Sequence, residues 1–121
     1  MSAVAPRTED LHIDELVAWA KVDAVKHDES KPRFDLIPPN AMYEIADIYT
    51  YGANKYGDRN WEKGMSWSRL YAAVQRHLNA CHAGQELDEE STRAHLAHAA
   101  TNLIFLLEYA RTHEEFDDRG G

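Results

Sequence analysis

The sequence predicts an all-α protein, and three observations support this prediction. Apolar residues recur at the spacing of an amphipathic helix in several separate segments. No segment shows the apolar and polar alternation of a half-buried strand. Residues 94–107 contain no Asp, Glu, Lys or Arg, and their apolar side chains point in almost every direction around a helix. We therefore expect four main helices, with the helix over 92–109 central and buried on most sides.

Size and composition limit the possible functions. A chain of 121 residues fits one domain, which we place at 11–113, between a flexible arm over 1–10 and a charged tail over 114–121 that we expect to fray. The formal net charge of −8 argues against binding a nucleic-acid backbone. A single cysteine, no secretory signal and no spanning segment indicate a cytoplasmic protein without a membrane helix.

The first elements are a helix and a proline-rich connection. Residues 11–26 carry apolar side chains on one side and charges on the other, which predicts a helix. Residues 27–40 hold three of the four prolines and are expected to form an ordered extended segment. Its charged residues Lys31 and Arg33 fit a solvated loop, but anchored loops also bind ligands.

The second helix is predicted over 39–56, with Pro39 in its first turn. Glu44 and Asp47 lie three residues apart on its polar face, so their carboxylates project from adjacent turns. Such a pair can share a hard divalent cation, although two acids at this spacing are also common on solvated faces.

A loop over 57–66 is bounded by Gly57 and Gly64. Trp61 beside Asn60, with Lys55 just before the loop, is a combination that can hold a nucleobase and a phosphate, or Trp61 can cover the core. We favour the binding interpretation.

The third helix is predicted over 67–83, with Ser66 as its cap. Its expected buried stripe consists of Trp67, Leu70, Val74, Leu78 and Cys81. His77 lies at the edge of this stripe, and Arg76 lies on the far side, where an arginine is usually surface charge.

The central helix follows a short loop over 84–91, in which Asp88 or Ser91 is a candidate cap. His95, His98 and Asn102 stack along one of its faces. Buried polar groups need partners, so this trio predicts a polar network, a metal site or a ligand site.

Four ordered blocks carry a family resemblance. They are KPRFDLIPP, GANKYGDRNWEKG, SRLYAAVQRHL and HLAHAATNLIFLL, which span residues 31–109 approximately. The set resembles the bacteriophage dATP/dGTP pyrophosphohydrolases of the MazG-like all-α group, of the MazZ type found with 2-aminoadenine genomes. The resemblance implies a four-helix MazG-like bundle that cleaves dGTP or dATP to the monophosphate and pyrophosphate with two or three Mg²⁺ or Mn²⁺ ions. It also implies a role in the nucleotide pool of the infected host cytoplasm.

The resemblance also implies roles for particular residues. The family pattern is E-x-x-E followed by E-x-x-D, and Glu44 and Asp47 match the first pair as catalytic metal ligands. In place of the second pair stand His95 and His98, which complete or support the metal shell; Asp88, Glu90 or a neighbouring subunit can supply the missing acids. The expected substrate contacts are Lys31, Arg33, Lys55 and Arg76 for the phosphates, Asn60 and Trp61 for the nucleoside, and His77 in support.

Two other interpretations stay open. One is a metallophosphohydrolase centred on His77, His95 and His98, and the other is a non-catalytic helical protein that binds a nucleotide or a partner. The helices carry more apolar surface than one subunit covers, which predicts a homodimer or homotetramer.

Overall fold

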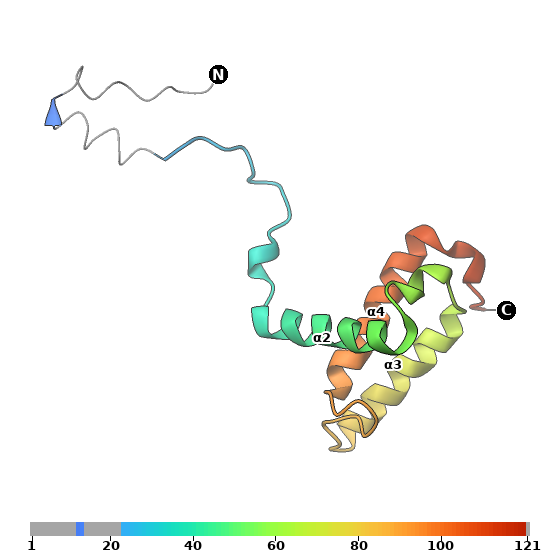
Figure 1. Ribbon diagram of the computed structural model, residues 1–121. Coiled ribbons are helices and arrows are strands. Elements are labelled where there is room, and N and C mark those ends of the chain that lie inside the picture. Colours follow the sequence, from blue (N-terminus) through green and yellow to red (C-terminus); the bar gives the residue numbers. More distant parts are fainter. Residues whose placement is uncertain (1–11, 14–22, 121) are drawn as a thin grey trace. The chain divides into compact units, whose positions relative to one another are not determined.

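The computed structural model describes residues 12–13 and 23–120 (Figure 1). The chain divides into two compact units, Met1–Arg33 and Phe34–Gly121. In the first unit, residues 23–28 have no regular secondary structure, so the helix predicted over 11–26 does not include 23–26. Val25 is exposed there, and a helical end without packing has little support. Residues 11 and 14–22 of that prediction lie outside the described residues.

The second unit is helical. Its elements are η2 (Phe34–Leu36), α2 (Pro39–Tyr56), η3 (Asn60–Lys63), α3 (Trp67–His82), α4 (His95–Thr112) and η4 (Glu114–Phe116). Within residues 12–13 and 23–120 the backbone forms no strand beyond one isolated bridge between Leu87 and Ala94. The all-α prediction is confirmed. Helices α3 and α4 pack side by side, and α2 contacts α4 (Figure 1).

The ends of α2 and α3 follow from local chemistry. Pro39 fits the first turn of α2 because that position needs no hydrogen-bond donor. Gly57 ends the helix with φ at 96°, a conformation that few other residues adopt, and its N–H donates to the Ala53 carbonyl. Ser66 precedes α3, but the predicted side-chain cap is absent. Asp118 accepts hydrogen bonds from the backbone N–H and the hydroxyl of Ser68 instead.

The core lies between α3, α4 and the two short segments that follow α2 and α4. Its buried centre is Trp67, Leu70, Leu106 and Tyr109, and the side chains packed against it are Trp61, Met65, Phe105 and Phe116. The expectation that the tail frays is therefore wrong for its first residues. Phe116 packs on the core, and Asp118 binds the start of α3.

The buried stripe of α3 differs from the prediction at the C-terminal end of the helix. Trp67, Leu70, Val74 and His77 are buried, whereas 42% of Leu78 is exposed and Cys81 is half-buried. His77 therefore occupies a core position rather than the edge of the stripe. The reason is a tertiary contact, because His77 faces His95 of α4 and their rings are within hydrogen-bonding distance. An apolar side chain at position 77 would leave the buried His95 without this partner.

Helix α4 is buried around more than half of its circumference, so the expectation that it is buried on most sides fails only along one exposed stripe. His95, Leu106 and Tyr109 are buried, together with Ala97, Ala99 and Thr101. The opposite side exposes Leu96, Leu103, Ile104 and Leu107. Of the helices in the described part of the chain, none combines the length and the hydropathy needed to cross a membrane.

Candidate functional site

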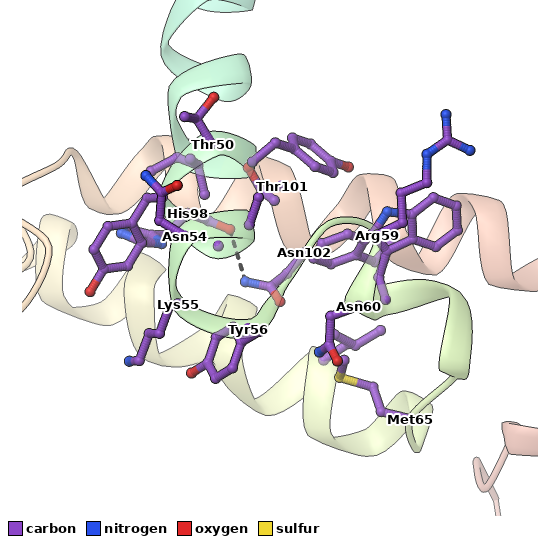
Figure 2. Close-up of a pocket in the computed structure, with 18 of the residues that line it drawn as sticks. Thr50, Asn54, Lys55, Tyr56, Arg59, Asn60, Met65, His98, Thr101 and Asn102 are labelled. Carbon is purple, nitrogen blue, oxygen red and sulfur yellow. Dashed lines mark hydrogen bonds between the residues drawn. The ribbon is translucent and has the colours of Figure 1, made fainter.

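The second unit contains a pocket of about 1030 Å³. It is lined by the C-terminal half of α2, the loop over 57–65, and parts of α3 and α4. Figure 2 shows Lys55, Asn60 and Asn102 among the residues that line it, from α2, the loop and α4, respectively. The volume is at the upper end of the range of small-molecule sites. Of the predicted substrate contacts, Lys55, Asn60, Trp61, Arg76 and His77 all line this pocket.

A cluster of histidines lies beneath one side of the pocket. Nδ1 of His77 on α3 lies 2.9 Å from Nδ1 of His95 on α4. The rings of His77 and His98 stack, with centroids 4.7 Å apart and planes within 8°. Burial lowers the pKa of His77 to about 4, and it also lowers the pKa of His98. His77 is therefore neutral at pH 7, with a ring nitrogen able to accept a hydrogen bond or bind a metal.

The loop between α3 and α4 supplies the partners of this cluster. The Ser91 side chain is buried, and its hydroxyl lies 2.6 Å from Nε2 of His98. The Ser91 backbone N–H donates to a carboxylate oxygen of Asp88 at 2.8 Å. This hydrogen bond lowers the pKa of Asp88 against the opposing effect of burial, so the carboxylate is ionised at pH 7. Asp88 and Ser91 do not cap α4, whose first flanking residue is Ala94 without a side-chain cap.

Lys55 is paired with an acid of the same loop. Its ammonium group contacts a carboxylate oxygen of Glu90, which also accepts a hydrogen bond from the Tyr51 hydroxyl at 3.4 Å. This pairing raises the pKa of Lys55 and lowers that of Glu90. The pair is solvent-exposed, so the interaction is weak and exchangeable. An anionic ligand can therefore replace Glu90 as the partner of Lys55.

The predicted carboxylate pair lies outside the residues that line the pocket. Glu44 is exposed on the first half of α2. Asp47 accepts a hydrogen bond from Nε of Arg93 at 2.7 Å, and the Arg93 guanidinium lies 4.8 Å from the centre of the Tyr51 ring. The structure thus holds Asp47 in an ion pair and does not bring Glu44 to His95 and His98. Their role as metal ligands stays a prediction.

The remaining predicted contacts fall into two groups. Trp61 lines the pocket and also packs on the core, with its ring centroid 6.1 Å from that of Phe105. The two interpretations of Trp61 are therefore compatible. Lys31 and Arg33 belong to the first unit, where both are exposed, and their role as phosphate contacts stays a prediction.

Sequence reasoning gave too little weight to the loop over 84–94. It treated Asp88 and Glu90 as minor candidates, and it did not assign a site role to Ser91, Arg93 or Tyr51. One signal was available: a short polar loop joins the helix that carries His77 to the helix that carries His95 and His98. A loop of that length must lie close to the facing ends of both helices, so its polar groups are natural partners for buried histidines.

This arrangement can bind an anion and a cation near each other. Basic side chains line the pocket at Lys55, Arg59, Lys63, Arg69 and Arg76. A neutral imidazole and an ionised carboxylate, from His77 and Asp88, face the same space. Ser91 is buried and bound to His98, so it is not placed to attack a ligand in the pocket. The site suits hydrolysis by an activated water rather than by a covalent nucleophile.

Comparison with known proteins gives one family and one relative. Residues 21–119 match the model of a family described as dATP/dGTP diphosphohydrolase, N-terminal. Over 95 residues the chain is 35% identical to a protein of Salmonella phage PMBT28 named dATP/dGTP diphosphohydrolase. The match covers 78% of this chain but 32% of the relative, so the chain spans about a third of the length of that protein. No solved structure matches the chain.

Proposed function

This chain belongs to the family of dATP/dGTP diphosphohydrolase N-terminal domains, and from that premise we propose that it hydrolyses purine deoxynucleoside triphosphates. The proposed products are the monophosphate, dGMP or dAMP, and pyrophosphate. A reaction of this kind lowers the supply of a purine deoxynucleotide during phage replication. The proposal assigns to this chain the activity for which the phage relative is named, although the chain matches only about a third of that protein.

One observation carries the proposal. Five predicted substrate contacts, drawn from two separate sequence blocks, line a single pocket. Trp61 offers an aromatic face for a purine, and Asn60 offers an amide that can both donate and accept hydrogen bonds. Lys55 and Arg76 offer cationic groups for the phosphates. A solvated surface would not gather one aromatic, one amide and two cationic groups around a concave space.

The proposed chemistry is attack by water on a phosphorus atom of the substrate. Lys55 and Arg76 neutralise charge on the phosphates and orient them, and positioning of this kind supplies much of the catalysis of phosphoryl transfer. The ionised Asp88 and the neutral His77 are the groups in the pocket suited to bind a cation that would activate the attacking water.

We propose that the reaction depends on a divalent cation, Mg²⁺ or Mn²⁺, in two or three copies. A bound cation lowers the pKa of water and stabilises the leaving pyrophosphate. The donors present fit Mn²⁺ better than Mg²⁺, because buried histidine nitrogens stand beside a carboxylate of the same pocket. Glu44 and Asp47 remain candidate ligands for a further ion if Asp47 exchanges its partner Arg93 for a metal.

The first test is product analysis with each of the eight common nucleoside triphosphates, with Mg²⁺, with Mn²⁺ and with a chelator. We expect pyrophosphate together with dGMP or dAMP, and only when metal is present. Release of inorganic phosphate, or no cleavage under any condition, would contradict the proposal and leave a non-catalytic nucleotide-binding protein.

A matched pair of variants tests the role of the pocket. Arg76→Met removes a cation that lines the pocket, whereas Arg111→Met removes an exposed cation in the last turn of α4, outside the lining residues. Arg76→Met should raise KM by about tenfold or more, because a charged hydrogen bond contributes about 1.5–3 kcal/mol. Arg111→Met should leave KM unchanged, and equal effects of the two would remove Arg76 from the phosphate site.

A further inference from the structure

We propose that His77, Asp88 and His95 together form a binding site for one divalent transition-metal ion, such as Mn²⁺, Co²⁺ or Zn²⁺. The three residues come from α3, the α3–α4 loop and α4, so the site joins the two helices of a hairpin near the loop that connects them. Cation binding follows from the geometry of the residues alone. A role for the bound ion in cleavage of a triphosphate rests on the function proposed above.

The donor atoms of the three side chains lie near one another. One ligand atom from each of the three side chains lies within 4.8 Å of the other two. The two Nδ1 atoms of His77 and His95 lie 2.9 Å apart. Two nitrogens that each lie about 2.1 Å from a shared ion, at an angle of about 90°, are separated by about 3 Å. The histidine pair is thus already near the spacing that a shared ion requires.

His95 provides an independent reason to expect a ligand. Its side chain is buried, with 5% of the residue exposed. Its Nε2 atom is buried and has no hydrogen-bond partner in the described part of the chain. An unpaired buried polar atom costs about 1–3 kcal/mol, and natural structures seldom retain one without a reason. One ion takes one nitrogen of His95. An ion bound at Nδ1 leaves Nε2 to a bound water, whereas an ion bound at Nε2 satisfies the unpaired atom and leaves the two Nδ1 atoms hydrogen-bonded to each other.

Neighbouring groups hold the three side chains in position. The Ser91 backbone N–H fixes the Asp88 carboxylate at 2.8 Å. The His98 ring stacks on the His77 ring, and the Ser91 hydroxyl in turn binds His98. Support of this kind orients metal ligands in proteins and restricts their rotation. Ser91 and His98 are therefore positioning residues for the proposed site.

The donor set selects the class of ion. Two imidazole nitrogens and one carboxylate suit Mn²⁺, Co²⁺ and Zn²⁺, whereas Mg²⁺ prefers oxygen ligands. Three protein ligands leave positions free for water or for a substrate oxygen. His77 and Asp88 both line the pocket, so such a ligand can reach the ion from the space that holds the substrate.

The test is a titration of metal-free protein with Co²⁺, followed by visible absorption, in excess Mg²⁺ and without nucleotide. Wild-type protein should bind one ion per chain with an absorption band that reports nitrogen ligands. Asp88→Asn keeps an oxygen for the Ser91 N–H but removes the charge, and should weaken Co²⁺ binding at least tenfold. His77→Gln should weaken binding and shift the band. His82→Gln, an exposed histidine at the end of the same helix, should change neither.

The outcomes separate the two proposals. If Asp88→Asn and His77→Gln bind Co²⁺ as wild type does, or if wild type binds none, His77 and His95 are a hydrogen-bonded pair only. Circular dichroism measures whether each variant is folded. If His77→Gln is unfolded, the Co²⁺ titration of Asp88→Asn alone decides the test. If Co²⁺ binds as expected but no triphosphate releases pyrophosphate, the metal site stands and the proposed reaction fails. If pyrophosphate is released equally by wild type and Asp88→Asn, the ion has no part in cleavage.

Discussion

Gly64 is the residue at which the wall of the pocket meets the end of the chain. It follows η3, which carries Trp61, and its φ of 89° is in the region that favours glycine. A Cβ atom on Gly64 would overlap the ring of Phe116. Close contact between this backbone and Phe116 is therefore possible only without a side chain. Gly84 has a similar φ of 99°, but a Cβ there meets nothing within 4 Å.

Gly64→Ala should destabilise the protein by about 1–3 kcal/mol, from the sum of backbone strain and overlap with Phe116. Gly84→Ala should cost less because only the backbone term applies. Urea unfolding of both variants measures the difference. A Phe116→Ala background should reduce the cost of Gly64→Ala, and an unchanged cost there would show that the overlap has no energetic effect.

Site residues were predictable where local sequence determines their position, and unpredictable where a contact between distant residues determines it. Lys55, Asn60, Trp61, Arg76 and His77 were placed in a common site, and the pocket brings them together. The helical periodicity of α3 predicts His77 at the edge of the buried stripe, because periodicity holds no information about the residue that faces it, which is His95. The pairing of Asp47 with Arg93 joins residues 46 apart in the chain, and helical spacing carries no information about such contacts.

At the scale of the elements, the N-terminus of α3 depends on a residue from the end of the chain. The carboxylate of Asp118 accepts hydrogen bonds from the backbone N–H of Ser68 at 2.9 Å and from its hydroxyl at 2.6 Å. An acid at this position satisfies one of the unpaired N–H groups at a helix start and complements the helix dipole. These hydrogen bonds lower the pKa of Asp118.

Asp118→Ala should lower the melting temperature at pH 7, because α3 loses this partner. The pKa of Asp118 is lower in the folded state than its usual value of 3.8, so its stabilising effect is complete above pH 3.8 and is lost as the pH falls through the folded value. The difference between wild type and variant should therefore shrink on acidification. Calorimetry at pH 7 and pH 3 measures this difference in melting temperature. Glu115→Ala, a variant in the same tail, should have the same melting temperature as wild type. An effect of Asp118→Ala that is independent of pH would contradict the role of its charge.

The bounds of two helices were predictable, whereas those of the central helix were not. The segments 39–56 and 67–83 agree with α2 and, within one residue, with α3, because proline and glycine act through local backbone geometry. The helix predicted over 92–109 starts and ends three residues before α4, because Thr92 has a positive φ of 61° and Ala94 is still bridged to Leu87. Caps were less predictable. Ser66 has the preferred residue type for its position, yet Asp118 provides the hydrogen bonds, and a residue 50 positions away from Ser68 lies beyond any local pattern.

At the scale of the whole molecule, α4 has an apolar side without a cover in the described chain. Leu96, Leu103 and Leu107 lie along one stripe of this helix and are 57%, 50% and 74% exposed, respectively. Ile104 beside them is 38% exposed. A contiguous apolar stripe of this kind is typical of an interface between subunits. We expect a second copy of the chain to cover it.

Replacing both Leu103 and Leu107 with Glu should convert an oligomer into monomers, because two charges cannot be buried in an apolar interface without partners. Sedimentation equilibrium of wild type and variant gives the two masses. Leu87→Glu places the same charge at a leucine that is 55% exposed but lies outside α4, and should leave the mass unchanged. A monomeric wild type would contradict the predicted homodimer or homotetramer.

The contact between Phe116 and Gly64 also affects how the chain can be shortened. Residues after Thr112 look dispensable because most of them are charged, and they would be the first to be trimmed for crystallisation. Yet they cover the loop that presents Trp61, and the Trp67 indole donates to the His113 carbonyl nearby. A shortened protein that ends at His113 would keep every proposed ligand and substrate contact and still present a loosened wall to the nucleotide.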